Sequence, residues 1–140
     1  MARLLSIDYG RKRTGIAVSD PLQIIANGLT TVETSKLLEF LDDYLKKEEV
    51  EVVVVGLPKH MSGELSENMK RIEPFVNRFK KLYPEIPVEY YDERFTSKMA
   101  QQAMLDGGLK KKARRSKELV DEISATIILQ GYMESKRMNN

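Results

Sequence analysis

Four consecutive valines, Val52–Val55, limit the possible folds more than any other feature of this sequence. β-Branched residues favour strands, and a strand without alternation of apolar and polar residues is one that is buried on both faces. Strands of this kind occur almost only in parallel sheets that helices cover on either side. The run therefore predicts an α/β protein in which residues 52–55 form a buried parallel strand.

The segment 4–20, LLSIDYGRKRTGIAVSD, predicts a β-hairpin with a basic turn. Two apolar runs flank a polar stretch that Gly10 and Gly15 bracket, and Asp8 lies where the first strand gives way to the turn. A carboxylate in this position is either a ligand of a metal that binds a phosphate, or it bonds its own backbone, as aspartates in turns do. The hairpin alone does not separate these two interpretations.

Apolar spacing predicts the other elements, which follow as strand 28–33, helix 37–45, helix 65–83, strand 87–91, helix 97–106 and helix 116–137. We expect Thr34 or Ser35 to be the N-cap of the first helix. Pro74 lies inside the second helix, and because the apolar stripe keeps its phase across the proline, we expect one kinked helix there.

The order of these elements predicts where the polar strand ends meet. Three strands form a meander, and two more follow through helical crossovers, whose right-handedness makes the later strands parallel to the first. The first, fourth and fifth strands then end at one edge of the sheet, which gathers Asp8, the loop 56–58 and the pair Asp92 and Glu93. Ligands of open α/β sheets bind outside such strand ends.

A further carboxylate, Asp121, lies in the last helix on a face shared with Ala125, Ile128 and Tyr132. An aspartate on a largely apolar face needs a partner, and a metal shared with Asp8 is one such partner. Three hard oxygen ligands suit Mg²⁺ or Mn²⁺, and pairs of these ions on α/β scaffolds perform phosphoryl chemistry.

The third ligand would come from residues 92–93. Asp92 and Glu93 point to opposite faces if the strand continues through them, so only one of them can reach the metals. The residues themselves leave that choice open.

Composition excludes several classes of site. The chain has 140 residues, which suits a single domain spanning 1–140, with no cysteine and one histidine, His60. Thiolate zinc sites, cysteine nucleophiles and multi-histidine zinc sites are therefore impossible. The sequence has no apolar run of transmembrane length and no signal-peptide pattern, so we expect a cytoplasmic protein without a membrane partner.

Basic residues gather in two places although the formal net charge is only +2. Six of the eight residues 110–117 are Lys or Arg, and Lys111, Lys112, Arg114 and Arg115 are the candidate phosphate contacts among them. The hairpin turn carries Arg11, Lys12 and Arg13. Either group is a solvated segment or a phosphate-binding one, and in the second case binding would be salt-sensitive and independent of base sequence.

Four ordered motifs, DYGRKRTGIAVSD, GLPKHMSG, YDERFTS and VDEISATIILQGY, resemble those of the YqgF/RuvX family from end to end. Its members are described as Holliday junction resolvases or pre-16S ribosomal RNA nucleases. The resemblance implies a ribonuclease H-like fold with a five-stranded mixed sheet of order 3-2-1-4-5, flanked by helices. It also implies a metal-dependent phosphodiesterase site that acts in ribosomal RNA maturation.

The resemblance assigns the catalytic, metal-binding trio to Asp8, Glu93 and Asp121, and it matches Arg13 to the basic residue of the first motif. It thereby selects Glu93 over Asp92. The dipeptide Lys59-His60 departs from the family pattern, so no role is transferred to His60.

The function predicted from the sequence is that of a Mg²⁺- or Mn²⁺-dependent nuclease that processes the 5′ end of pre-16S ribosomal RNA. A Holliday junction resolvase acting on four-way DNA and a non-catalytic RNA or ribosome-assembly binder are the alternatives. An ATP-using protein of the actin and sugar-kinase type would need two such domains, which 140 residues do not supply. The substrate, precursor RNA or branched DNA, and the oligomeric state, monomer or homodimer, stay open.

Overall fold

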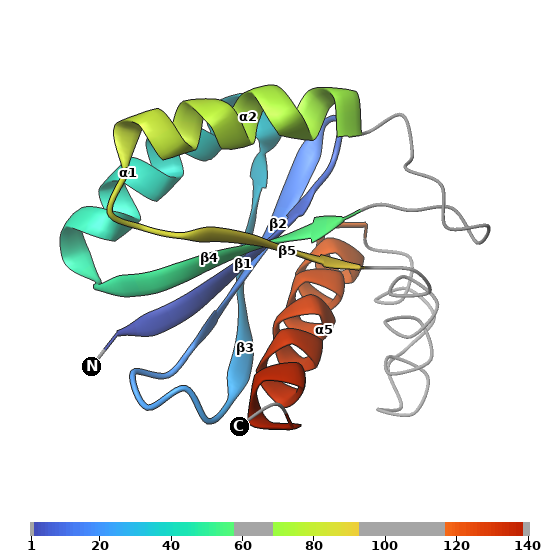
Figure 1. Cartoon of the computed structure of the whole chain (residues 1–140). Coiled ribbons are helices and arrows are strands. Elements are labelled where there is room, and N and C mark those ends of the chain that lie inside the picture. Colours follow the sequence, from blue (N-terminus) through green and yellow to red (C-terminus); the bar gives the residue numbers. More distant parts are fainter. Residues whose placement is uncertain (1, 58–68, 93–116, 139–140) are drawn as a thin grey trace.

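The computed structural model describes residues 2–57, 69–92 and 117–138. Within these ranges one five-stranded sheet has the order β3-β2-β1-β4-β5, with α1 and α2 on one face and α5 on the other (Figure 1). The elements are β1 (Arg3–Tyr9), β2 (Arg13–Ser19), β3 (Ala26–Glu33), the 3₁₀ turn η1 (Thr34–Lys36), α1 (Leu37–Lys47), β4 (Val50–Leu57), α2 (Met69–Leu82), β5 (Val88–Asp92) and α5 (Lys117–Met138). The predicted sheet order is confirmed.

The strand directions also agree with the sequence. β2 is antiparallel to β1 and to β3, whereas β1, β4 and β5 run parallel to one another. In β4, Val53, Val54 and Val55 are at most 1% exposed, which confirms a strand buried on both faces. The carboxyl ends of β1, β4 and β5 therefore lie at one edge of the sheet.

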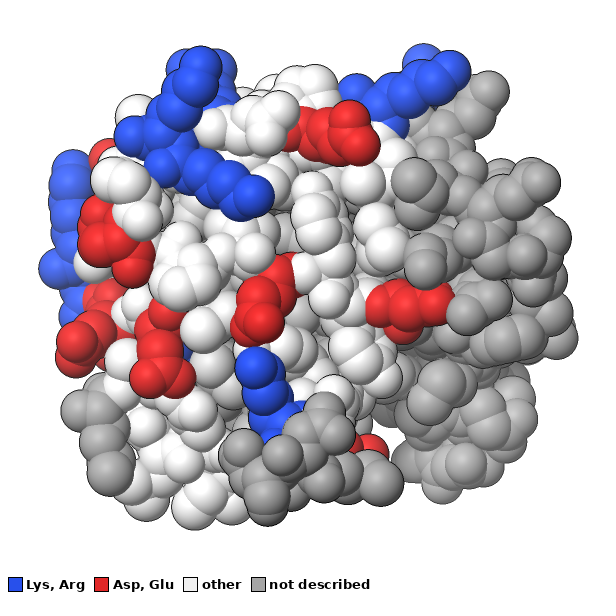
Figure 2. All heavy atoms as spheres, viewed as in Figure 1, with Lys and Arg blue, Asp and Glu red and all other residues white. Residues whose placement is uncertain are grey.

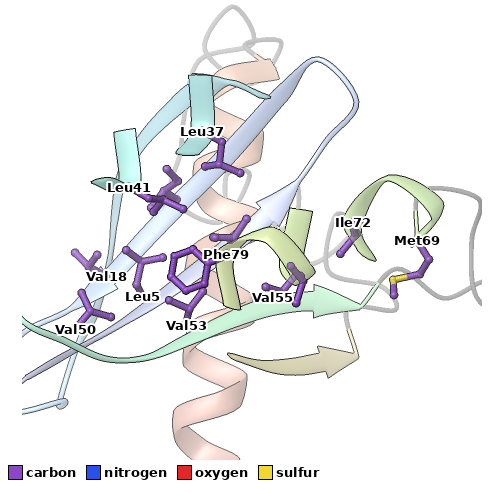
Figure 3. Packing of buried hydrophobic residues seen from close by; sticks show 13 residues of the cluster. Leu5, Val18, Leu37, Leu41, Val50, Val53, Val55, Met69, Ile72 and Phe79 are labelled. Carbon is purple, nitrogen blue, oxygen red and sulfur yellow. The ribbon is translucent and has the colours of Figure 1, made fainter. Parts of the chain in front are cut away.

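Large apolar side chains fill the space between the sheet and the helices α1 and α2 (Figure 3). Leu5 of β1, Leu41 of α1 and Phe79 of α2 belong to this cluster, and each is at most 1% exposed. Helix α2 continues through Pro74, so the prediction of one helix across the proline is confirmed.

The opposite face, beneath α5, mixes large side chains with several small ones. Ala17 of β2 and Ala125 of α5 are fully buried there, beside Leu4, Val54 and Leu129. Because Ala17 and Ala125 are small, α5 can lie close to the backbone of the sheet at these positions.

The predicted N-cap of α1 is wrong. The helix is preceded by η1, and its N-cap residue is Lys36, which makes no side-chain capping bond. The Thr34 hydroxyl instead donates a hydrogen bond to the carbonyl oxygen of Gly10, at 2.7 Å, and lies 2.9 Å from Thr14 Oγ1. Thr34 therefore ties η1 to the β1–β2 turn, and a contact distant in sequence replaces the local one.

None of the helices that the structure describes combines the length and the apolar character needed to cross a membrane.

Candidate active site at the carboxyl edge of the sheet

Asp8 is the second-last residue of β1 and lies on the α5 face of the sheet. Alternate residues of a strand share a face, and Leu4 and Ser6 both face α5. The Ser6 hydroxyl donates a 2.6 Å hydrogen bond to the carbonyl oxygen of Ala125 in α5. Asp8 follows Ser6 by two residues, so its carboxylate projects on the same side.

Asp121 meets this strand end across a glycine. Gly15 is the register partner of Asp8 in β2, and a Cβ atom built on Gly15 would overlap the backbone carbonyl of Asp121. Only a residue without a side chain admits α5 this closely. Asp8 and Asp121 are thus neighbours of the same glycine, although they lie in the first strand and the last described helix.

Arg13 completes the described part of the site. Its Nε donates a hydrogen bond to Oδ2 of Asp121 at 3.1 Å, and the two side chains are 34% and 24% exposed. From the sequence, a metal was a possible partner of Asp121 and a phosphate a possible partner of Arg13. In the structure the two residues pair with each other, because Arg13 and Gly15 are two positions apart on one face of β2.

The remaining members of the Asp121 face lie as predicted. Ala125 and Ile128 are fully buried and Tyr132 is 7% exposed, all in the cluster beneath α5. Glu122, the neighbour of Asp121, is partly buried, and its Cβ lies near the position of a Cβ added to Gly28 of β3.

Asp92 ends β5, and the strand pattern assigns it to the other face of the sheet. Glu89 accepts a hydrogen bond from the Tyr132 hydroxyl of α5, and Tyr91 packs in the same cluster, so these alternate residues face α5. Asp92, next to Tyr91, therefore lies on the α2 face, away from Asp8. Glu93 lies outside the described residues.

Other predicted residues also fall outside the described ranges. They are His60 and the basic residues Lys111, Lys112, Arg114 and Arg115. Arg11 is described and is exposed in the β1–β2 turn, next to the strand end that carries Asp8.

The donor set fits a hard divalent cation. Asp8 and Asp121 present carboxylate oxygens from one face of the sheet, and oxygen ligands are those that Mg²⁺ and Mn²⁺ prefer. In the described ranges no group of three or more His, Asp or Glu side chains could hold a metal ion. A complete site would therefore need a ligand from outside these ranges, which is where Glu93 lies.

The sequence model of the RuvX family, described as Holliday junction resolvase, matches residues 2–135. The chain belongs to this family. Relatives named "Putative pre-16S rRNA nuclease" include one from Bacteroides fragilis, 65% identical over 99% of this chain and 100% of that protein. Another, from Bacteroides thetaiotaomicron, is 67% identical over 98% of this chain and 99% of that protein.

Two solved structures share the fold of this RuvX-family chain. The RuvC of T. thermophilus in complex with a Holliday junction substrate superposes with a TM-score of 0.58 at 21% identity, covering 98% of this chain and 96% of that one. The Fowlpox virus resolvase in complex with Holliday junction DNA gives a TM-score of 0.60 at 14% identity, covering 96% and 98%. The ribonuclease H-like fold predicted from the motifs is thereby confirmed.

Proposed function

We propose that this RuvX-family chain is a divalent-metal-dependent nuclease that hydrolyses phosphodiester bonds and matures the 5′ end of pre-16S ribosomal RNA in the cytoplasm. The observation that carries the proposal is the meeting of Asp8 and Asp121 across Gly15, with Arg13 beside them. The names of relatives more than 60% identical to this chain support the choice of RNA.

The chemistry follows from the charges at this edge. Asp8 and Asp121 would hold Mg²⁺ or Mn²⁺, with Glu93 as the proposed third ligand. A bound ion of this kind activates water at neutral pH and neutralises the negative charge that develops on the oxygens of the phosphate. Asp8 is held by the β1–β2 ladder, so its carboxylate needs little reorganisation to bind a cation.

Arg13 would orient the scissile phosphate. Its guanidinium is fixed at one end by Asp121, and an arginine presents several planar N–H donors to a phosphate. Arg11 and the basic residues Lys111, Lys112, Arg114 and Arg115 are proposed to bind phosphates of the backbone farther along the strand.

Asp8→Asn tests the site with little change of shape. We expect cleavage of a pre-16S 5′ RNA with Mg²⁺ or Mn²⁺ to fall to background, while the circular dichroism spectrum and RNA affinity in EDTA are kept. Asp121→Asn should behave alike, although it also weakens the pair with Arg13.

Asp92→Asn is the matched control, since it removes a carboxylate of the same sheet edge on the other face. It should cost much less activity than Glu93→Gln. Full activity of Asp8→Asn, or a larger loss in Asp92→Asn than in Glu93→Gln, would contradict the assignment.

A Holliday junction resolvase is the second candidate, because the family model carries that description. To separate the two candidates, the cleavage of precursor RNA and of four-way DNA is measured in parallel at the same metal concentration. A resolvase that cuts both strands of a junction is expected to be a symmetric dimer, which light scattering measures. Binding of RNA with no cleavage of either substrate would favour a non-catalytic assembly factor.

A further inference from the structure

A concave surface lies on the face of the sheet opposite Asp8 and Asp121, between η1–α1 and α2. We call it the α1–α2 groove; its volume is about 280 Å³. Tyr9, Leu38 and Phe75 line it with apolar surface, and the rings of Tyr9 and Phe75 lie 5.4 Å apart between centroids. The groove thus offers aromatic surface beside polar groups.

Arg71 and Arg78 supply the charge of the groove. They are exposed, they both line it, and they lie seven residues apart on α2. Neither guanidinium forms an ion pair or hydrogen bond within the described part of the chain, whereas Arg3 pairs with Glu48 and Arg13 with Asp121. Two cations beside a cavity, with no ion pair in the described ranges, are suited to an anionic ligand.

The electrostatics of Tyr9 agree with this geometry. Burial raises the pKa of the Tyr9 phenol, and the positive charge of Arg71 opposes that rise. Basic side chains also predominate on the helix as a whole: of the residues in MKRIEPFVNRFKKL, five are Lys or Arg and one is Glu. Figure 2 shows blue side chains along the upper edge of the molecule, where Figure 1 places α2.

The groove is joined to the candidate active site by the β1–β2 turn. Tyr9 directly follows Asp8 in β1, so the two side chains project on opposite faces of the same strand end. The Thr34 hydroxyl bonds the Gly10 carbonyl, and the Thr34 amide donates to the carbonyl oxygen of Lys12 at 2.9 Å. A strand that crosses this turn can therefore contact both surfaces.

We propose that the α1–α2 groove binds an unpaired segment of the substrate strand, with a base or ribose against Tyr9 and Phe75 and with different phosphates on Arg71 and Arg78. This inference rests on the proposed function, since it takes nucleic acid as the substrate. Seven residues of helix advance by about 10 Å, a spacing that suits two phosphates of one strand better than a single shared one. Aromatic surface favours an unpaired strand, because the bases of a duplex are already stacked.

The test compares two double variants of α2 that lose the same charge. Arg71→Gln/Arg78→Gln alters the groove, whereas Lys80→Gln/Lys81→Gln alters exposed residues of the same helix that do not line it. Binding of a labelled single-stranded RNA is measured by fluorescence anisotropy in EDTA, over a series of salt concentrations. The same RNA annealed to its complement is the second ligand.

For single-stranded RNA we expect the arginine variant to bind at least about tenfold more weakly at low salt, because charge-assisted hydrogen bonds are lost. The slope of log affinity against log salt should fall by about 1.4, or about 0.7 for each of the two phosphate contacts. The lysine variant should change little, and the duplex should not distinguish the two variants.

Equal losses in both variants would mean that α2 attracts RNA only through its overall charge, which would overturn the proposal. A loss with duplex as large as that with the single strand would also overturn it. Because EDTA prevents metal-dependent cleavage, the binding result is read separately from the nuclease activity. Specific groove binding together with an inactive protein in the cleavage assays would contradict the nuclease function alone.

Discussion

The two faces of the sheet are packed in opposite ways. Beneath α1 and α2 the contacts are between large side chains such as Leu5, Leu41 and Phe79, which are removed from water almost completely. Beneath α5 large side chains such as Leu129 and Tyr132 also pack, but beside the candidate site small residues contact backbone: Gly15 lies against the Asp121 carbonyl, and the Ser6 hydroxyl bonds the Ala125 carbonyl.

This difference shows how one small protein separates stability from the candidate chemistry. Large apolar side chains supply much of the hydrophobic stabilisation, and they also keep a helix well away from the sheet. The small residues of the other face give up some of that stabilisation, but they bring Asp121 of the helix to the strand end that carries Asp8. We therefore expect mutations on the two faces to affect stability and activity in different proportions.

The largest loss of stability is expected from Phe79→Ala on the α2 face. The ring is 1% exposed, and truncation of such a residue costs about 3–5 kcal/mol of the free energy of unfolding. Urea unfolding measures the loss, and the protein that remains folded should keep its cleavage rate. A loss below about 1 kcal/mol would show that this face is not the main source of stability.

Gly15→Ala should have the opposite effect, with a large loss of activity and only a moderate loss of stability. The added methyl group overlaps the Asp121 carbonyl, so α5 must shift, at a cost of about 1–3 kcal/mol. The cleavage rate should fall about 100-fold, since a displacement near 1 Å misplaces the reacting groups.

Gly28→Ala is the control for Gly15→Ala. It also faces α5, but its added Cβ would lie 3.3 Å from the Thr126 hydroxyl oxygen, which is a much milder contact. This variant should keep most of the activity. Equal activities in the two glycine variants would disprove the special role of Gly15.

Ser6→Ala should have a smaller effect than either of these core changes. It removes one buried hydrogen bond between β1 and α5, worth about 1 kcal/mol of the free energy of unfolding. Ser35→Ala, at an exposed position, should change stability by less than about 0.5 kcal/mol. A thermal melt of both variants makes the comparison, and an unchanged melting temperature for Ser6→Ala would count against a polar attachment of α5.

Periodicity in the sequence predicted the order of the elements and the buried face of the last helix. Val52–Val55, for instance, predicted a strand buried on both sides because burial alone dictates the apolar pattern of such a strand. Asp121 was likewise correctly assigned to the same helical face as Ala125.

Contacts between residues far apart in the chain were not predicted. The pairing of Arg13 with Asp121 and the approach of the helix to Gly15 depend on how α5 lies across β2. No local pattern encodes that alignment, so Gly15 was interpreted only as a residue that bounds a turn. The N-cap prediction failed for the same reason, because Thr34 bonds Gly10 instead of its own helix.

The pair of Arg13 and Asp121 joins residues 108 positions apart. Closing so long a loop costs conformational entropy, and contacts of this separation slow folding. A chain emerging from the ribosome presents the Asp8 strand first and the Asp121 helix only after more than a hundred further residues. The proposed site therefore stays incomplete until α5 has been synthesised and has packed against β2, so the activity proposed here would appear only after that step.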